Sequence, residues 1–229
     1  MILEGLVTTL NADQSVHLRP MGPVFSDPQG DAFQLRPYEP SGTLDNLRRS
    51  GQGVLHVTDD VLLIARAALR QLQAVPPTSP ALHVQGCILA DCCHWLEFEV
   101  VDYLPGSPRH EFRCRVVHRG RHRDFWGFNR ARHAVLEATI LATRVGILPD
   151  DEIRTAMQSL WSPVEKTAGH QEREAWNLVR TNLVESLGEA DLPPGFSLPP
   201  HSEVAKSEAT LDVSVDELDN TNADLRKLP

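Results

Sequence analysis

Short runs of alternating hydrophobic and polar residues fill the first half of the chain. The side chains of a β-strand point alternately to its two faces, so such runs predict strands with one buried face. Turn-forming Asn, Asp, Pro and Gly separate the runs, as at residues 11–14 and 105–108. Six or seven strands without a βαβ rhythm predict a mainly β fold, a closed or nearly closed antiparallel barrel. We expect strands at residues 2–10, 16–21, 32–36, 54–57, 94–103 and 111–117, with a basic turn at 118–123.

Five further stretches predict helices, two within the barrel sequence and three after it. The last three follow a change of composition near residue 128. We therefore expect a barrel at residues 1–127, a small C-terminal α-helical subdomain at 128–189 and an acidic tail at 190–229. In the tail Leu211, Val213 and Val215 alternate, which predicts a short strand laid on a sheet edge. The predicted helices span residues 41–50, 61–72, 129–145, 149–161 and 170–187.

The segment at residues 36–51 predicts a helix whose start can bind an anion. Ser41 or Thr43 is a natural N-cap, because a short side-chain oxygen can accept a hydrogen bond from a first-turn amide. Gly51 suits the end of the helix, where a left-handed residue is needed. The amides and the dipole of a helix N-terminus favour negative charge, and hydroxyls and Arg36 flank this one. The alternative is an ordinary capped helix that binds nothing.

Composition narrows the class of protein. The chain has 229 residues, 41% hydrophobic and 23% charged, as globular proteins have, and its net charge of −9 argues against nucleic acid as a general partner. No run of about 18 apolar residues predicts a membrane span. The first residues carry neither the basic nor the apolar region of a signal peptide, so we expect a cytoplasmic protein. The four cysteines lack C-x-x-C spacing, which favours small buried hydrophobes over a metal site.

Arginines are concentrated in one part of this acidic chain. Seven of them fall between Arg113 and Arg132. Because arginine suits bidentate recognition of phosphate and carboxylate, this stretch is a candidate site for a small anionic ligand. The alternative is a solvated strand face with salt bridges.

Three segments of the first half resemble the flavin reductase-like FMN-binding split barrels. Residues 7–22 look like the opening hairpin of that family, which ends in x-Pro. Residues 41–47 are similar to its Ser…Thr-x-x-Asn-Ile/Leu segment, and residues 53–58 to the strand that follows. More narrowly, residues 2–187 resemble an uncharacterised domain-of-unknown-function family that adds a C-terminal helical extension to this barrel. The chain departs from the flavin reductases at Gly42, where they usually carry a lysine or another polar residue.

The resemblance implies an FMN-binding split β-barrel and a homodimer with flavin near the subunit interface. Ser41 and Thr43 would hold the phosphate with Asn46 close by, and Arg36 would lie at the same helix start. The hairpin backbone at Arg19, Pro20 and Met21 would face the isoalloxazine.

Two functions follow from this resemblance. The first is a flavin-dependent oxidoreductase that acts on an unidentified small anionic substrate, with a nicotinamide dinucleotide or a pterin-like molecule held by the arginines. The second is a dimer that binds FMN, or a related anionic cofactor, without turnover. No G-x-S-x-G, H-E-x-x-H, P-loop or G-x-G-x-x-G motif is present, so catalytic residues stay unassigned.

Overall fold

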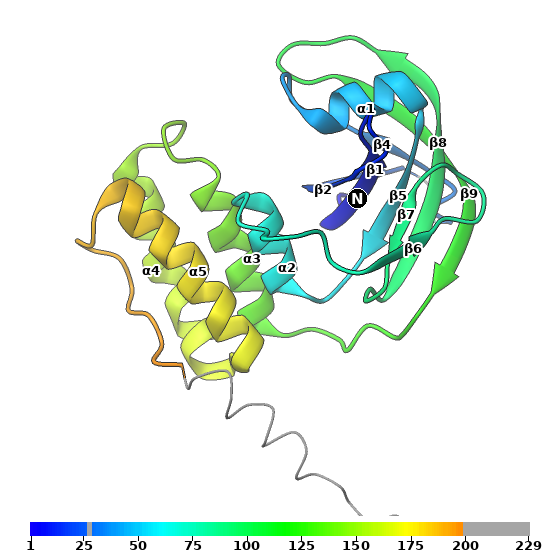
Figure 1. The fold of residues 1–229 in the computed structure, drawn as a ribbon. Coiled ribbons are helices and arrows are strands. Elements are labelled where there is room, and N and C mark those ends of the chain that lie inside the picture. The colour runs from blue at the N-terminus through cyan, green and yellow to red at the C-terminus, as the bar shows by residue number, and fades with distance from the viewer. Residues whose placement is uncertain (27–28, 199–229) are drawn as a thin grey trace, which may run out of the picture. The chain divides into compact units, whose positions relative to one another are not determined.

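The computed structural model describes residues 1–26 and 29–198 of the chain (Figure 1). Its strands are β1 Gly5–Leu10, β2 Val16–Met21, β3 Val24–Phe25, β4 Ala32–Leu35, β5 Gln52–Val57, β6 Thr78–Pro80, β7 Cys87–Leu89, β8 His94–Leu104 and β9 Glu111–Arg121. Its helices are α1 Gly42–Ser50, α2 Val61–Ala68, α3 Arg130–Ala142, α4 Asp150–Thr167 and α5 His170–Leu187. The strand expected at residues 211–215 lies outside the described residues.

Seven strands form one sheet in the order β2-β1-β5-β8-β9-β4-β3, and every neighbouring pair is antiparallel. The sheet curls into a half-barrel, with α1 at one end of it (Figure 1). Residues before β1 pair with β3 at one edge of the sheet: the Leu3 N–H donates to the Pro23 carbonyl at 3.1 Å, and the Phe25 N–H to the Met1 carbonyl at 2.8 Å. The predicted antiparallel barrel is therefore confirmed as a curled half-barrel.

Apolar side chains fill the concave side of the sheet. They come from six of its strands and from α1, whose Leu44 and Leu47 are buried there. Alternation along each strand explains this placement, since Leu55, Leu96 and Phe98 face inward. The whole buried set is Val7, Phe25, Phe33, Leu35, Leu44, Leu47, Leu55, Leu96, Phe98, Phe112 and Cys114.

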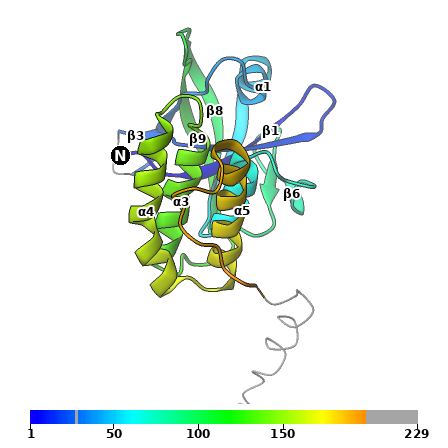
Figure 2. The ribbon, with the colours of Figure 1, turned by 90° about the vertical axis from the view of Figure 1, so that its left-hand side faces the viewer.

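Helix α2 joins the half-barrel to the C-terminal helices. Its Ile64 and Ala67 pack on the outer side of the sheet with Leu6 and Val54. The neighbouring positions of α2, Val61, Leu62 and Ala65, belong instead to the core of the helices α3–α5. Figure 2 shows α3, α4 and α5 gathered together on one side of the sheet.

The strand after the 105–108 turn is longer than its sequence predicts. Residues 118–123 were expected to form a basic turn, but β9 continues to Arg121 because it stays paired with β8 down to the His94–Arg121 pair. A separate two-stranded sheet, β6–β7, was not predicted either. The bounds of β2 and α5 agree with the prediction.

His56 is buried in the sheet in a single tautomer. Its Nδ1 lies 3.2 Å from the Leu6 carbonyl oxygen, to which it donates, and its Nε2 accepts from the Leu89 N–H at 3.1 Å. Burial lowers the pKa of His56 to about 4, since a charged ring is costly there.

This depressed pKa predicts acid destabilisation centred on His56. The unfolded chain gains a proton near pH 6.5 and the folded chain only near pH 4, so stability is present above pH 6.5 and is lost as the pH falls. Between pH 7 and pH 5 the loss from this ring is about 2 kcal/mol. In His56→Gln the loss of unfolding free energy between pH 7 and pH 5 should be smaller than in the natural protein by that amount. Urea unfolding at both pH values measures it. Equal losses in the two proteins would contradict the assignment.

Candidate functional site

Helix α1 begins where the sequence predicts. The Ser41 hydroxyl accepts from the Leu44 N–H at 3.3 Å, so Ser41 is the N-cap, and Gly51 ends the helix with a φ of 63°. Ser41 is half-buried, while Arg36 is exposed just after β4. The first turn of α1 therefore offers its amides together with a partly exposed hydroxyl, which is the arrangement that favours a phosphate.

Thr43 lies two residues after the N-cap Ser41, and its side chain faces the β1–β2 hairpin. Its hydroxyl is 3.1 Å from His17 Nε2, and Thr43 is only 2% exposed. A Cβ at Gly42 would lie 2.8 Å from His17 Cε1, so the imidazole occupies the space beside residue 42. Burial and nearby Arg19 lower the pKa of His17. His17 thus supplies a polar group next to the helix start, where the glycine supplies none.

Asn46 fixes the helix to the same hairpin. Its amide donates to the Thr9 hydroxyl at 3.0 Å and to Asn11 Oδ1 at 2.9 Å, and its carbonyl oxygen accepts from Arg49 at 3.0 Å. Asn46 is 3% exposed. These bonds give Asn46 a structural role: it holds the α1 start against residues 9–17.

The predicted isoalloxazine-facing residues lie on β2, an edge strand of the sheet. Arg19 is half-buried and donates to the Ala67 carbonyl of α2 at 3.0 Å. Pro20 pairs with Leu6, and Met21 packs partly against the concave core. The structure thus joins Thr43 and Asn46 to one end of the hairpin, while Arg19 to Met21 lie further along β2.

Sequence reasoning missed His17 as part of this site. Its position in a strand with ordinary alternation gave no sign of a polar role. The one available signal was Gly42, because a glycine at a helix start lacks a Cβ and leaves room for a neighbour.

Most arginines of the predicted anion-binding stretch have carboxylate partners. Arg113, Arg115, Arg119, Arg121, Arg123 and Arg132 each form an ion pair with Asp or Glu. This supports the salt-bridge interpretation for those side chains. Of the seven, only Arg123 and Arg132 share a buried partner.

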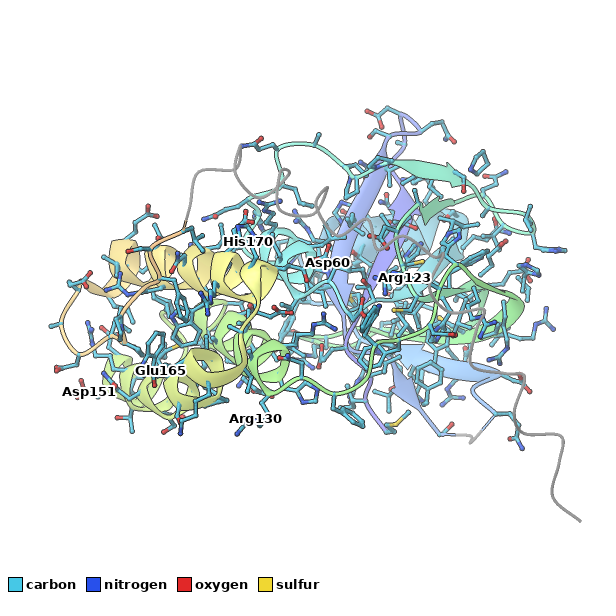
Figure 3. All side chains as sticks on the ribbon, turned by 90° about the horizontal axis from the view of Figure 1, so that it is seen from below. Asp60, Arg123, Arg130, Asp151, Glu165 and His170 are labelled. Atoms are coloured by element: carbon cyan, nitrogen blue, oxygen red, sulfur yellow. The ribbon has the colours of Figure 1, made fainter. Side chains whose placement is uncertain are left out.

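That partner, Asp59, links the half-barrel to the C-terminal helices. Its Oδ1 accepts from Arg123 at 2.6 Å and its Oδ2 from Arg132 of α3 at 3.3 Å, while Arg132 also bonds Glu172 of α5 at 2.7 Å. Burial opposes the ionisation of Asp59, but the bonds from Arg123 and from the Trp126 N–H hold its pKa below the usual value. In Figure 3 Arg123 lies beside the sheet strands, while Arg130, the first residue of α3, lies at the C-terminal helices.

The cysteines are thiols, and three of them are buried as expected. Cys92, Cys93 and Cys114 are at most 1% exposed, and burial raises the pKa of Cys92 to about 12. Across residues 1–26 and 29–198 no three His, Cys, Asp or Glu side chains are placed to hold a metal ion. Across the same residues, no helix has both the length and the apolar character needed to cross a membrane.

Two family models match the chain. The model described as a protein of unknown function (DUF447), N-terminal domain, matches residues 3–123, and its C-terminal counterpart matches residues 129–181. Among curated protein sequences none matches this chain.

The chain is also similar to solved structures. An FMN-bound DUF447 protein from Methanosarcina mazei is 21% identical, with a TM-score of 0.68 over 80% of this chain and 95% of that one. The styrene monooxygenase flavin reductase from Pseudomonas putida S12 is 13% identical, with a TM-score of 0.46 over 52% of this chain and 80% of that one. The first similarity confirms the predicted fold: the curled half-barrel of the flavin reductase-like proteins, followed by α3–α5.

Proposed function

Because this chain belongs to the DUF447 family, whose N-terminal and C-terminal models match it in sequence, we propose that it binds FMN through the start of helix α1. We further propose that it is an FMN-dependent oxidoreductase acting on a small anionic substrate. The observation that carries this proposal is the α1 start itself, where the Ser41 hydroxyl caps the helix and Thr43 meets His17 of β2.

The donor set suits a phosphomonoester. Hydroxyls and an imidazole can donate to phosphate oxygens, and the helix dipole favours their negative charge. Arg36 is exposed nearby in sequence, at the end of β4, and can add a charge-assisted hydrogen bond. The related Methanosarcina mazei protein is FMN-bound, which agrees with this assignment.

The flavin supplies the hydride or electron transfer when it is bound. The protein's own residues bind and orient it. Ser41, Thr43 and His17 hold the phosphate, Asn46 keeps the helix against the hairpin, and the β2 backbone at Arg19–Met21 lies alongside the ring. A homodimer with flavin near its interface is part of the proposal, and sedimentation equilibrium tests it.

Thr43→Ala is expected to weaken FMN binding by about 1–3 kcal/mol, because the charged phosphate loses one donor. Titration of FMN fluorescence measures the dissociation constant, with riboflavin, which lacks the phosphate, as the matched ligand. Thr43→Ser, which keeps the hydroxyl, should bind FMN nearly as the natural protein does. An unchanged FMN affinity in Thr43→Ala, or an equal loss for riboflavin, would place the phosphate elsewhere.

The second function, FMN binding without turnover, differs from the first in one measurable step. Stopped-flow mixing of the FMN-loaded protein with NADH or NADPH should bleach the flavin if the protein is an oxidoreductase that uses these donors. A flavin that stays oxidised with both donors, and with a dithionite-reduced carrier, supports the binding protein instead.

A further inference from the structure

A pocket of about 420 Å³ opens at one end of the half-barrel, and its lining includes none of Ser41, Thr43 and His17. A volume of this size lies within the range of ligand pockets. Its walls come from the residues before β1, from β3, and from the paired ends of β5, β8 and β9, including Leu3, Phe25, Val57, His94, Trp95 and Arg121.

Strand register explains why this end of the half-barrel is basic. Leu55 of β5, Leu96 of β8 and Arg119 of β9 lie in one row across the sheet, and the leucines belong to the concave core. The next row on the same face is Val57, His94 and Arg121. Inward-facing positions therefore change from aliphatic to basic as β9 ends, and both arginines line the pocket.

Trp95 of β8 also lines the pocket, but its indole packs in the cluster on the outer side of the sheet, opposite to the inward-facing arginines. Trp95 is 9% exposed, and its indole lies over Gly120, where a Cβ would stand 2.0 Å from Trp95 Cζ2. His122 lies on the same indole with 4.6 Å between ring centroids, and the Trp95 Nε1–H donates to Glu97 at 3.4 Å. The apolar surface beside the two arginines therefore comes from Phe25 and Leu96, which belong to the concave core and line the pocket.

The charges in the pocket favour an anion. Among its described lining residues none carries a carboxylate. Arg119 and Arg121 pair instead with Asp31 and Asp124, whose side chains are 77% and 83% exposed. Such exposed pairs contribute little free energy, and turning Arg119 to a ligand also exchanges its 2.8 Å hydrogen bond to the Gly30 carbonyl.

The pocket lies away from the proposed phosphate site. Leu3 lines it, whereas Thr9, which bonds Asn46, is six residues further along, about 20 Å in extended chain. In Figure 1, β9 ends at the opposite end of the sheet from α1. Met1 and Phe25 line the pocket, and the segments that contain them pair with each other. The segment with Phe25 follows the β2 stretch that is proposed to lie along the flavin ring.

We propose that this pocket binds a second ligand, a small molecule with an anionic group and an apolar part, with Arg119 and Arg121 on the anion and with Phe25 and Leu96 against the apolar part. As the substrate site of a flavoenzyme it rests on the proposed function. The proposal that the pocket binds an anion is independent of that function and rests on the geometry of β8 and β9.

The test uses a probe of this chemistry, 8-anilinonaphthalene-1-sulfonate, and its neutral counterpart N-phenyl-1-naphthylamine. Calorimetric and fluorescence titrations of the full chain should show one sulfonate per chain and at least tenfold weaker binding of the neutral compound. Arg119→Gln/Arg121→Gln should weaken sulfonate binding about tenfold. Arg115→Gln, a matched change on the same strand outside the pocket, and Thr43→Ala should leave it unchanged.

Four results would overturn or separate the assignments. Equal binding of the two compounds, or no effect of the double variant, would overturn the anion site. Competition between FMN and the sulfonate, with FMN affinity lost in the double variant, would show that the pocket is the flavin's own site and overturn the second ligand. Arginine-dependent sulfonate binding by a protein that binds no FMN would support the anion site while the proposed function fails.

Discussion

Replacing Asp59 by asparagine is expected to lower the free energy of unfolding by about 3 kcal/mol, because it leaves two arginines short of a buried partner. The Asp59 side chain is 5% exposed, and those of Arg123 and Arg132 are 33% and 25% exposed. Asparagine keeps the shape of the side chain but removes its charge. Urea unfolding followed by tryptophan fluorescence measures the loss.

Asp102→Asn is the matched control for this change. Asp102 also pairs with an arginine, Arg113 at 3.4 Å, but its side chain is 46% exposed, so the expected loss is less than about 1 kcal/mol. A similar loss in the two variants would show that the Asp59 cluster does not hold the half-barrel to α3 and α5.

Glu97→Gln is expected to lower the free energy of unfolding by about 3 kcal/mol, because a buried carboxylate that accepts four hydrogen bonds loses its charge. Glu97 is 0% exposed. Its oxygens accept from the N–H groups of Leu82, His83 and Val84 at 3.1, 2.6 and 3.2 Å, and from Trp95 Nε1 at 3.4 Å. A glutamine amide must turn its NH₂ group toward some of these donors.

Glu99→Gln, two residues along the same strand, is the control. Its side chain is 37% exposed and paired with Arg115 at 3.3 Å, so less than about 1 kcal/mol is expected. Hydrogen exchange gives a second readout, since the Leu82–Val84 amides should lose protection in Glu97→Gln alone. Unchanged protection there would contradict the assignment of these bonds.

The pKa of Glu97 adds a pH dependence to this prediction. Burial opposes its ionisation, but bonds from the His83 and Leu82 amides hold the pKa below the usual 4.5. A lowered pKa means that the stabilisation is present above pH 4.5 and is lost as the pH falls further. Glu97→Gln should lack this part of the acid sensitivity.

Signals from residues close together in the sequence were enough to predict much of the fold. Ser41 and Gly51 mark the ends of α1 because capping depends on neighbours along the chain. Asp60 likewise caps α2 by accepting from the Leu63 N–H at 2.8 Å. The division of the chain near residue 127 remains a prediction.

Features set by neighbours across the sheet could not be predicted in the same way. The basic segment 118–123 with its glycine was expected to turn, yet Gly120 is there because the Trp95 ring lies on it. Glu97 has the alternation of a solvent-facing strand position and is buried by the loop at residues 81–86.

The residues of the candidate site fall into the same two groups, those identified by neighbours along the chain and those identified only by the fold. Ser41, Thr43 and Asn46 could be chosen because they belong to one short segment with helix-start chemistry. His17 could not be chosen from the sequence, because only the packing of the hairpin against α1 brings it to Thr43. Arg19 was placed by resemblance, and its side chain bonds helix α2.

The measurement that tests the central claim most directly is an absorption spectrum of the purified protein after FMN is added and the free flavin is removed by gel filtration. We predict bands near about 375 and 450 nm that elute with the protein, and weaker bands with Thr43→Ala. A protein fraction without these bands after reconstitution would contradict FMN binding by this half-barrel.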